Sequence, residues 1–326
     1  MINPLIIVRD IHLASSVMVA GIVFFDLLVA SPVLRKDPRL AKAESSFREA
    51  AGKLLWGSLA LSIVSAVAWL WLLSARIAGR SIAEVIADGT VWMVLTQTQF
   101  GLAWEIRLLL ACLLAACLLL RLKAHEGPAA TQLLVAACLL AAAYLGALAF
   151  AGHGAEGLGF ERNIHLAADI LHLNAAGLWL GALAPLVLLL VRLQRSHGDG
   201  WTVAAAAAAG RFSTLGILAV GVLLVSGTIN AAFLLDGMHS LIDTGYGRLL
   251  LFKVVLFAAM VCLAGINRQY LLPRLACGLG VDQASGTLRK LVQGALVEIA
   301  LGLAIVCIVG LLGTMPPAHE MAAHMH

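Results

Sequence analysis

The ten histidines of this 326-residue chain are unevenly placed, and eight of them fall on the same side of a predicted membrane. Three of the eight lie within the last twelve residues, 315–326, together with three methionines. Imidazole and thioether groups are ligand types that suit copper. The residue types and their placement therefore predict a metal-handling protein, with copper as the first candidate metal.

Three ionisable residues share one stripe of a helix predicted over residues 164–191. His165, Asp169 and His172 are spaced i, i+4 and i+7, which places them on one helix face. A rise of about 1.5 Å per residue puts His172 about 10 Å from the predicted helix start. Ionisable groups at such depth usually face a bundle interior or a wet cavity. We expect a metal site, with Asp169 as a ligand or as a partner that orients a histidine. The alternative is an interfacial polar stripe.

Further candidate ligands lie at the ends of other apolar segments. His153 stands between two glycines and is a candidate entrance ligand. Met238 and His239 follow another apolar segment. The C-terminal tail could collect copper for the core site, or it could be a solvated terminus of biased composition. Its candidate ligands are Met315, His319, Met321, His324, Met325 and His326.

The composition predicts an all-α integral membrane protein surrounded by lipid. Hydrophobic residues make up 61% of the chain and charged residues only 12%, and the mean hydropathy is +0.96. A soluble domain has roughly a quarter charged residues, so this chain cannot cover a water-facing surface. A spanning helix needs about 20 mostly apolar residues. Eight such segments lie near residues 11–34, 54–73, 102–122, 132–151, 164–191, 212–235, 249–269 and 291–314, and residues 81–88 predict a short interfacial helix.

The basic residues predict the orientation of the eight spans. Fifteen of the 22 lysines and arginines fall in the loops that follow spans one, three, five and seven. Cytoplasmic loops carry such an excess, so both termini are expected on the outer side, which is the periplasm in a bacterium. The fifteen are Arg35, Lys36, Arg39, Lys42, Arg48, Lys53, Arg121, Lys123, Arg192, Arg195, Arg211, Arg268, Arg274, Arg289 and Lys290.

The two four-helix halves share short motifs at equal spacing, which predicts a parallel internal repeat. Spans one and five each carry a His-Leu pair with a glycine nine residues after the histidine. Spans three and seven each begin with a Thr-x-aromatic-Gly motif followed by a basic residue. The halves are residues 1–152 and 153–314, with residues 315–326 as a tail. A central metal site would lie between them, with His12 as a ligand beside His165, Asp169 and His172. The matched positions are His12 and His172, Gly21 and Gly181, and Arg107 and Lys253.

Other polar residues inside the spans allow two interpretations. Asp26 and Glu298 lie toward the cytoplasmic side, where they could continue a cation or proton path or could pair with loop arginines, and we expect the pairing. Arg107 and Lys253 are expected to bind carbonyls or carboxylates of neighbouring helices. The six cysteines form no CxxC motif and are expected to be small apolar packing residues.

Several function classes are disfavoured by missing motifs. The chain has no nucleotide-binding motif, no HExxH, no GxSxG and no basic stripe. We therefore expect a protein that is not an enzyme, does not hydrolyse ATP and does not bind nucleic acid.

A set of motifs in the second half resembles the CopD/PcoD family of copper-resistance membrane proteins. They are residues 171–181 (LHLNAAGLWLG), 211–213 (RFS), 226–227 (SG), 241–253 (LIDTGYGRLLLFK) and 267–268 (NR). The likeness covers nearly the whole chain, is densest over residues 211–275, and marks residues 211–314 as a CopD-like core. It departs from a common pattern in one place, where Gly181-Ala182 replaces a frequent glycine pair.

The resemblance implies an eight-span bacterial inner-membrane protein that handles copper. It implies copper uptake from the periplasm to the cytoplasm, with a separate periplasmic CopC-type carrier as donor. It leaves the oxidation state, Cu(I) or Cu(II), open. Two other functions stay open: a haem-binding electron-transfer protein with His12 and His172 as axial ligands, and a copper sensor or docking protein without transport.

Overall fold

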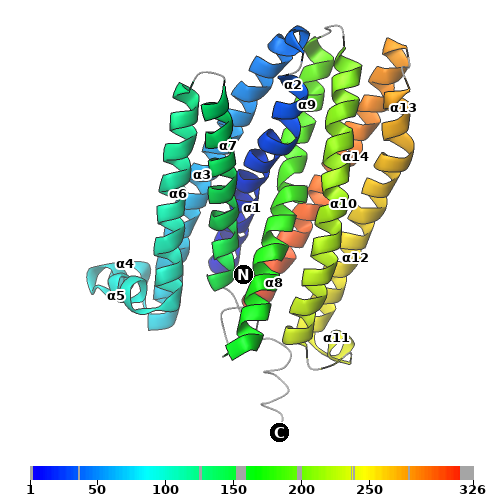
Figure 1. Cartoon of the computed structure of the whole chain (residues 1–326). Helices are drawn as coiled ribbons and strands as arrows, with labels where there is room; N and C mark the ends of the chain where they lie inside the picture. The colour runs from blue at the N-terminus through cyan, green and yellow to red at the C-terminus, as the bar shows by residue number, and fades with distance from the viewer. Residues whose placement is uncertain are drawn as a thin grey trace.

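The computed structural model describes residues 3–35, 37–124, 127–151, 159–196, 200–235, 237, 239–277 and 280–315. Over these residues the chain is helical and contains no strand. Long helices run side by side in a single bundle, and a pair of short helices projects from one side (Figure 1). Eight helical segments are long and apolar enough to cross a membrane, as the sequence predicts.

The eight segments include three that are interrupted by wider π-helical turns. The first is α1 (Pro4–Phe25), η1 (Asp26–Ala30) and α2 (Ser31–Leu34); the fifth is α8 (Gly159–Ala176), η5 (Gly177–Gly181) and α9 (Ala182–Ser196); the seventh is α12 (Gly245–Ile266), η6 (Asn267–Leu271) and α13 (Leu272–Ala276). The others are η2 (Pro38–Leu40) with α3 (Ala41–Ala78), α6 (Gln99–Lys123), α7 (Pro128–Gly146) with η3 (Ala147–Ala151), α10 (Trp201–Leu234) and α14 (Val281–Leu312). Short helices are α4 (Ile82–Ala87), α5 (Thr90–Gln97) and α11 (Ser240–Asp243).

Several helices begin earlier than the apolar pattern indicates, and this changes the depth of the histidines. The side chain of Asn3 accepts a hydrogen bond from the Leu5 amide, so α1 begins at Pro4 and His12 lies two turns inside it. Helix α8 begins at Gly159. His172 therefore lies about 20 Å from the helix start at about 1.5 Å per residue, about twice the expected depth.

Much of the predicted basic loop after the first span is helical. Helix α3 begins at Ala41, well before the apolar segment. Two ion pairs at i, i+4 spacing support this extension, Glu44 with Arg48 and Glu49 with Lys53. The predicted interfacial helix is present as α4, where Ser81 and Glu84 form a reciprocal capping box.

Two glycines allow α1 and η5 to cross in close contact at the centre of the bundle. Gly21 and Gly181 face each other, and a methyl group added at either would overlap backbone atoms of the other helix. Small residues at such crossings let backbones approach closely inside a membrane. The crossing brings the first and fifth spans together, with Ala20, Val17 and Leu183 buried beside it.

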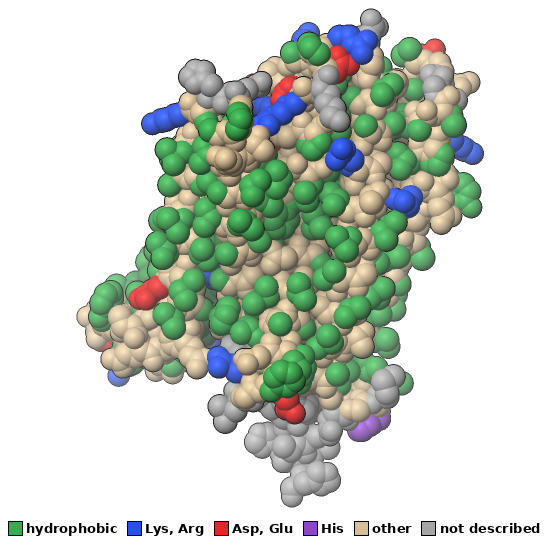
Figure 2. Space-filling view, viewed as in Figure 1, with side chains coloured by type: hydrophobic (Ala, Val, Ile, Leu, Met, Phe, Trp, Pro, Cys, Tyr) green, Lys and Arg blue, Asp and Glu red, His purple; other side chains and the backbone are tan. Residues whose placement is uncertain are grey.

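The outer surface is apolar along most of its height, and charge gathers at one end. Leucine, isoleucine and valine side chains cover the visible face, and lysine and arginine cluster where α2, α9 and α13 end (Figure 2). At the opposite end, Arg9 near the start of α1 donates a hydrogen bond to the carbonyl of Gly313, just after α14. The start of the first span and the end of the last therefore lie together.

All six cysteines are free thiols, in agreement with the absence of a CxxC motif. Their expected place in the core is correct for Cys117, which is buried, and partly for Cys138. The other four, Cys112, Cys262, Cys277 and Cys307, lie on the outer surface. They therefore act as apolar surface residues rather than as core packing.

The glycine crossing gives a direct stability prediction. Gly181→Ala should lower the melting temperature of the purified protein in detergent, because overpacking at a close helix crossing costs about 1–3 kcal/mol. Gly221→Ala is the matched control, since no atom lies within 4 Å of the added methyl on α10. Equal melting temperatures for the two variants would contradict the crossing.

Candidate metal-binding site

Four of the predicted site residues line one cavity of about 290 Å³ at the end of the bundle where α1 begins. These four are His12 from α1 and His165, Asp169 and His172 from α8. Elements α10, α12 and α14 close the cavity, with Asn230 and Lys253 among the lining residues. The sequence stripe on α8 thus faces the bundle interior, and the first span adds a histidine to the same space.

His172 is held by one ring nitrogen, which leaves the other available. Its Nδ1 lies 3.0 Å from the hydroxyl oxygen of Ser226 on α10. The Ser226 hydroxyl donates its own proton to the carbonyl of Val222 at 2.6 Å, so it accepts from His172. Nδ1 then carries the proton and Nε2 the lone pair, an assignment made from the hydrogen-bond network. Within the described residues no hydrogen bond reaches Nε2, and neutral imidazole with a free lone pair is the form that binds metals.

Asp169 lies one turn before His172 and is surrounded by polar partners. The amide of Asn230 donates a hydrogen bond of 2.5 Å to Oδ1 of Asp169. Lys253 on α12 interacts electrostatically with both Asp169 and His172. Asn230 keeps its carbonyl oxygen buried without a partner in the described part of the chain. The arrangement places a carboxylate and, within the described residues, an open amide oxygen in the cavity that His172 also lines.

His165 lies on the same face of α8, two turns nearer to the helix start. The side chain is buried and its ring stacks on Phe233 of α10, with 4.9 Å between ring centroids and an interplanar angle of 14°. The stacking fixes the plane of the imidazole at the wall of the cavity. His165 is thus oriented by packing, in contrast to the hydrogen-bonded His172.

His12 differs from His172 because both of its ring nitrogens are occupied. Nδ1 donates to the carbonyl of Ser62 at 2.9 Å and lies 3.2 Å from the Ser65 hydroxyl. Nε2 accepts a hydrogen bond of 2.9 Å from the guanidinium of Arg107. A metal could bind this nitrogen only if Arg107 moved away. In the observed arrangement His12 belongs to a hydrogen-bond network rather than to an open ligand set.

Arg107 anchors this network between three spans. It donates to the Tyr144 carbonyl at 2.6 Å and to the Ser16 hydroxyl at 3.1 Å, and its guanidinium lies 4.4 Å from the centre of the Tyr144 ring. This confirms the expectation that Arg107 binds a backbone carbonyl of a neighbouring helix. Among the described residues no carboxylate pairs with this buried charge, so these hydrogen bonds must replace its hydration.

The two halves make matched local contacts. In each half the histidine Nδ1 contacts a serine of the following span, Ser65 for His12 and Ser226 for His172. Spans three and seven begin alike: the hydroxyls of Thr98 and Thr244 cap the amides of the glycines three residues later, at 3.0 and 2.9 Å. The halves differ at the basic residue, because Arg107 binds its histidine directly.

The cavity gathers donors without completing a coordination sphere. Within the described ranges no three His, Cys, Asp or Glu side chains lie close enough together to hold a metal ion. A metal bound at His172 would need further donors from Asp169, Asn230 or His165 after side-chain movement, or from elsewhere.

The remaining predicted ligands lie away from the cavity or outside the described residues. His239 is exposed in the turn before α11 and does not line the cavity. Met315 follows α14 and packs against Tyr246, Ile308 and Leu312. The predictions for His153, Met238, His319, Met321, His324, Met325 and His326 fall outside the described residues.

Sequence reasoning missed the serines that orient the two histidines. Ser62, Ser65 and Ser226 are buried inside apolar helices. Small hydroxyl residues at i, i+3 spacing inside a span were an available signal, because buried polar side chains require partners in lipid.

The acidic residues Asp26 and Glu298 divide between the two expectations. Asp26 forms ion pairs with Arg121 at 2.7 Å and Arg48 at 3.3 Å, so its predicted pairing with arginines is confirmed. Glu298 instead accepts a hydrogen bond of 2.8 Å from the amide of Asn267 and, among the described residues, forms no ion pair. The expectation of an arginine partner is wrong for Glu298, because it faces an interior cavity.

Comparisons with known proteins agree with the motifs of the second half and extend to the first. The family model Copper resistance protein D matches residues 206–312, and the model Copper resistance protein D-like, N-terminal domain matches residues 1–163. No solved structure matches the chain significantly.

Three curated proteins are similar over most of the chain. Copper resistance protein D of Pseudomonas syringae pv. tomato is 31% identical over 81% of this chain and 85% of its own length. Inner membrane protein YebZ of Escherichia coli (strain K12) is 30% identical over 96% and 98%. Copper transport protein CutJ of Bacillus subtilis (strain 168) is 30% identical over 83% of this chain and 47% of its own length.

The buried arginine gives the second prediction. Arg107→Met should destabilise the protein by roughly 3 kcal/mol, because it leaves His12, Ser16 and the Tyr144 carbonyl without their donor. Arg80→Met removes only an exposed pair with Asp88, worth about 0–1 kcal/mol, and serves as the control. Thermal unfolding in detergent measures both, and a loss of equal size would contradict the network.

Proposed function

The chain belongs to the copper resistance protein D family, and from this premise we propose that it binds copper at the cavity of His172 and moves it across the bacterial inner membrane. The proposed direction is from periplasm to cytoplasm, without catalysis. The observation that carries the proposal is the cavity lined by His12, His165, Asp169 and His172. The printed names of the relatives, copper resistance, copper transport and inner membrane protein, support the same assignment.

In this proposal His172 is the first ligand of the entering copper ion. The imidazole lines a cavity that also contains a carboxylate and, within the described residues, an amide oxygen without a hydrogen-bond partner. Ser226 holds the opposite nitrogen and so fixes the ring, as outer hydrogen bonds commonly do for metal-binding histidines. His165 and Asp169 complete the site after small side-chain movements. His12 contributes a ligand only in a state where Arg107 has released it.

The orientation and the internal repeat belong to this proposal. The cluster of basic residues at the end of α2, α9 and α13 supports a cytoplasmic position for that end, and hence periplasmic termini. The matched histidine–serine contacts and threonine caps support two related halves. The facing glycines of α1 and η5 then lie near the axis that relates the halves.

Delivery of copper to the cavity is proposed to involve ligands outside it. His153, Met238, His239, and the methionines and histidines of residues 315–326 would collect copper at the periplasmic face. A separate CopC-type carrier would supply it. Lipid contacts the apolar outer surface.

Two alternatives make different measurable predictions. A bis-histidine haem site needs a free Nε2 on both His12 and His172, and the hydrogen bond from Arg107 disfavours this for His12. Haem would show a strong Soret band in the purified protein. A copper sensor or docking protein would bind copper and show no copper flux in proteoliposomes.

The direct test of the proposal is copper binding by the His172→Ala variant. The purified wild-type protein should bind one equivalent of copper in the cavity, and the variant should lose this equivalent. Glu49→Ala is the control, because this exposed carboxylate pairs with Lys53 and does not line the cavity. Unchanged binding in His172→Ala, with copper uptake also unchanged in proteoliposomes, would refute the assignment.

A subtler variant tests how the ligand is oriented. Ser226→Ala removes the hydroxyl that fixes His172 and should weaken copper binding by about 10–100-fold without abolishing it. Thr228→Ala, on the exposed side of the same helix, should bind like wild type. Competition with a chelator of known affinity measures both, and wild-type affinity in Ser226→Ala would mean that His172 is not the ligand.

A further inference from the structure

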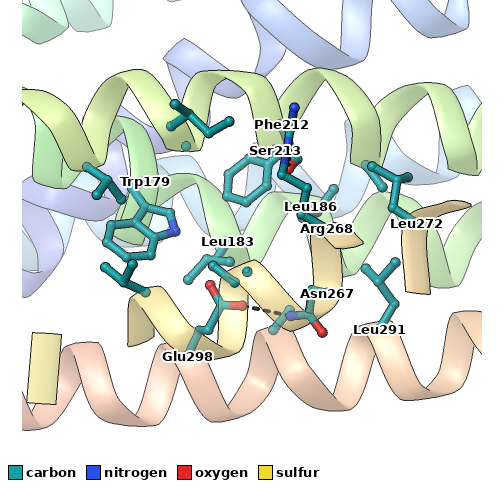
Figure 3. A pocket seen from close by; sticks show the side chains of 18 residues that line it. Trp179, Leu183, Leu186, Phe212, Ser213, Asn267, Arg268, Leu272, Leu291 and Glu298 are labelled. Carbon is teal, nitrogen blue, oxygen red and sulfur yellow. Dashed lines mark hydrogen bonds between the residues drawn. The ribbon is translucent and has the colours of Figure 1, made fainter. Parts of the chain in front are cut away.

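A second cavity, of about 200 Å³, lies between η5, α9, α10, η6 and α14. Its walls are mostly apolar, with Leu183, Phe212 and Leu291 among them (Figure 3). One carboxyl group, that of Glu298, faces this space, and the side chain is only 3% exposed. The metal-binding hypothesis uses none of these residues.

The carboxyl is held by a neutral partner. Asn267 donates a hydrogen bond of 2.8 Å to Oε1 (Figure 3). The indole of Trp179 lines the same cavity. Gly294, one turn before Glu298 on α14, makes room for this contact, because a methyl there would lie 2.7 Å from the Asn267 side chain. The local sequence thus builds a fixed place for one carboxyl group.

No cation compensates the carboxyl among the described residues. Arg268 is the other ionisable group that lines the cavity, and it donates instead to the Ser213 hydroxyl at 2.8 Å. The lining residues from η5, α9, α10 and α14 contribute no further charge. An unpaired charge in an apolar interior is costly, and a bound proton removes it. Ionisable residues so placed inside membrane proteins mark ion paths and proton relays.

The cavity also adjoins the space around His172. Trp179, which is 2% exposed, lines the Glu298 cavity and also a larger one of about 630 Å³ that contains His172 and Lys253. Trp179 and Asn267 both belong to π-helical turns, η5 and η6, and such turns are frequent at functional sites. Trp179 is therefore a wall shared by the Glu298 cavity and a cavity that His172 also lines.

We propose that Glu298 is a proton-binding site on the inner half of the copper path, and that it exchanges its proton when copper passes. This rests on the proposed function. The neutral carboxyl carries one proton. An approaching copper cation stabilises the negatively charged carboxylate, so the proton leaves the carboxyl for water. The amide of Asn267 is the polar group that donates to Glu298, and the described lining contains no His, Cys or Met, so the proton is the favoured occupant.

Infrared spectroscopy tests the proton site without reference to transport. The wild-type protein should show a band of a protonated carboxyl that disappears on titration with base. The band should be lost in Glu298→Gln and kept in Glu49→Gln, the same change at an exposed carboxyl. A band that survives in Glu298→Gln, or its absence from wild type, overturns the proposal.

Proteoliposomes test the exchange. Copper uptake by wild type should release protons and depend on pH, whereas Glu298→Gln should bind copper normally and lose both the proton release and the pH dependence. Lower copper stoichiometry in Glu298→Gln would make it a metal ligand and overturn the proton assignment. If wild type moves no copper, the proposed function and the exchange fail together, and the infrared band still decides whether Glu298 binds a proton.

Discussion

Every polar group inside this bundle must find a partner within the protein, because lipid offers no hydrogen bonds. The structure meets this requirement differently at each depth. Asp26 is neutralised by Arg48 and Arg121, and Arg107 is surrounded by a carbonyl, a hydroxyl and a histidine. Polar groups that lack some of these partners are therefore the best candidates for a function.

Among the described residues, most of the incompletely paired groups lie in the second half of the chain, although Oδ1 of Asp10 in the first half is also buried without a hydrogen-bond partner. His172 keeps a ring nitrogen open, Asn230 keeps a buried carbonyl oxygen without a partner, and Glu298 has only neutral neighbours within the described residues. In the first half, Arg107 donates a hydrogen bond to Nε2 of His12 and so occupies this nitrogen. The two histidines are thus held differently: Arg107 occupies Nε2 of His12, whereas within the described residues no hydrogen bond reaches Nε2 of His172.

Length and apolar composition were enough to predict eight spans, and the spacing on α8 was enough to place three ionisable residues on one interior face. The boundaries were less accurate, because Asn3 and the i, i+4 ion pairs of α3 extend helices beyond the apolar segments. The state of His12 could not be predicted. It depends on Arg107 reaching across from another span, and the order of residues does not reveal which helix faces which.

The central claim is that the free nitrogen of His172 receives copper. X-ray diffraction at the copper absorption edge tests it most directly, with a crystal of the wild-type protein that is loaded with one equivalent of copper. The account predicts one anomalous peak within bonding distance of Nε2 of His172, with Arg107 still bound to His12. A copper peak bonded to His12 with none at His172, or a loaded protein with no peak at the cavity, would contradict it.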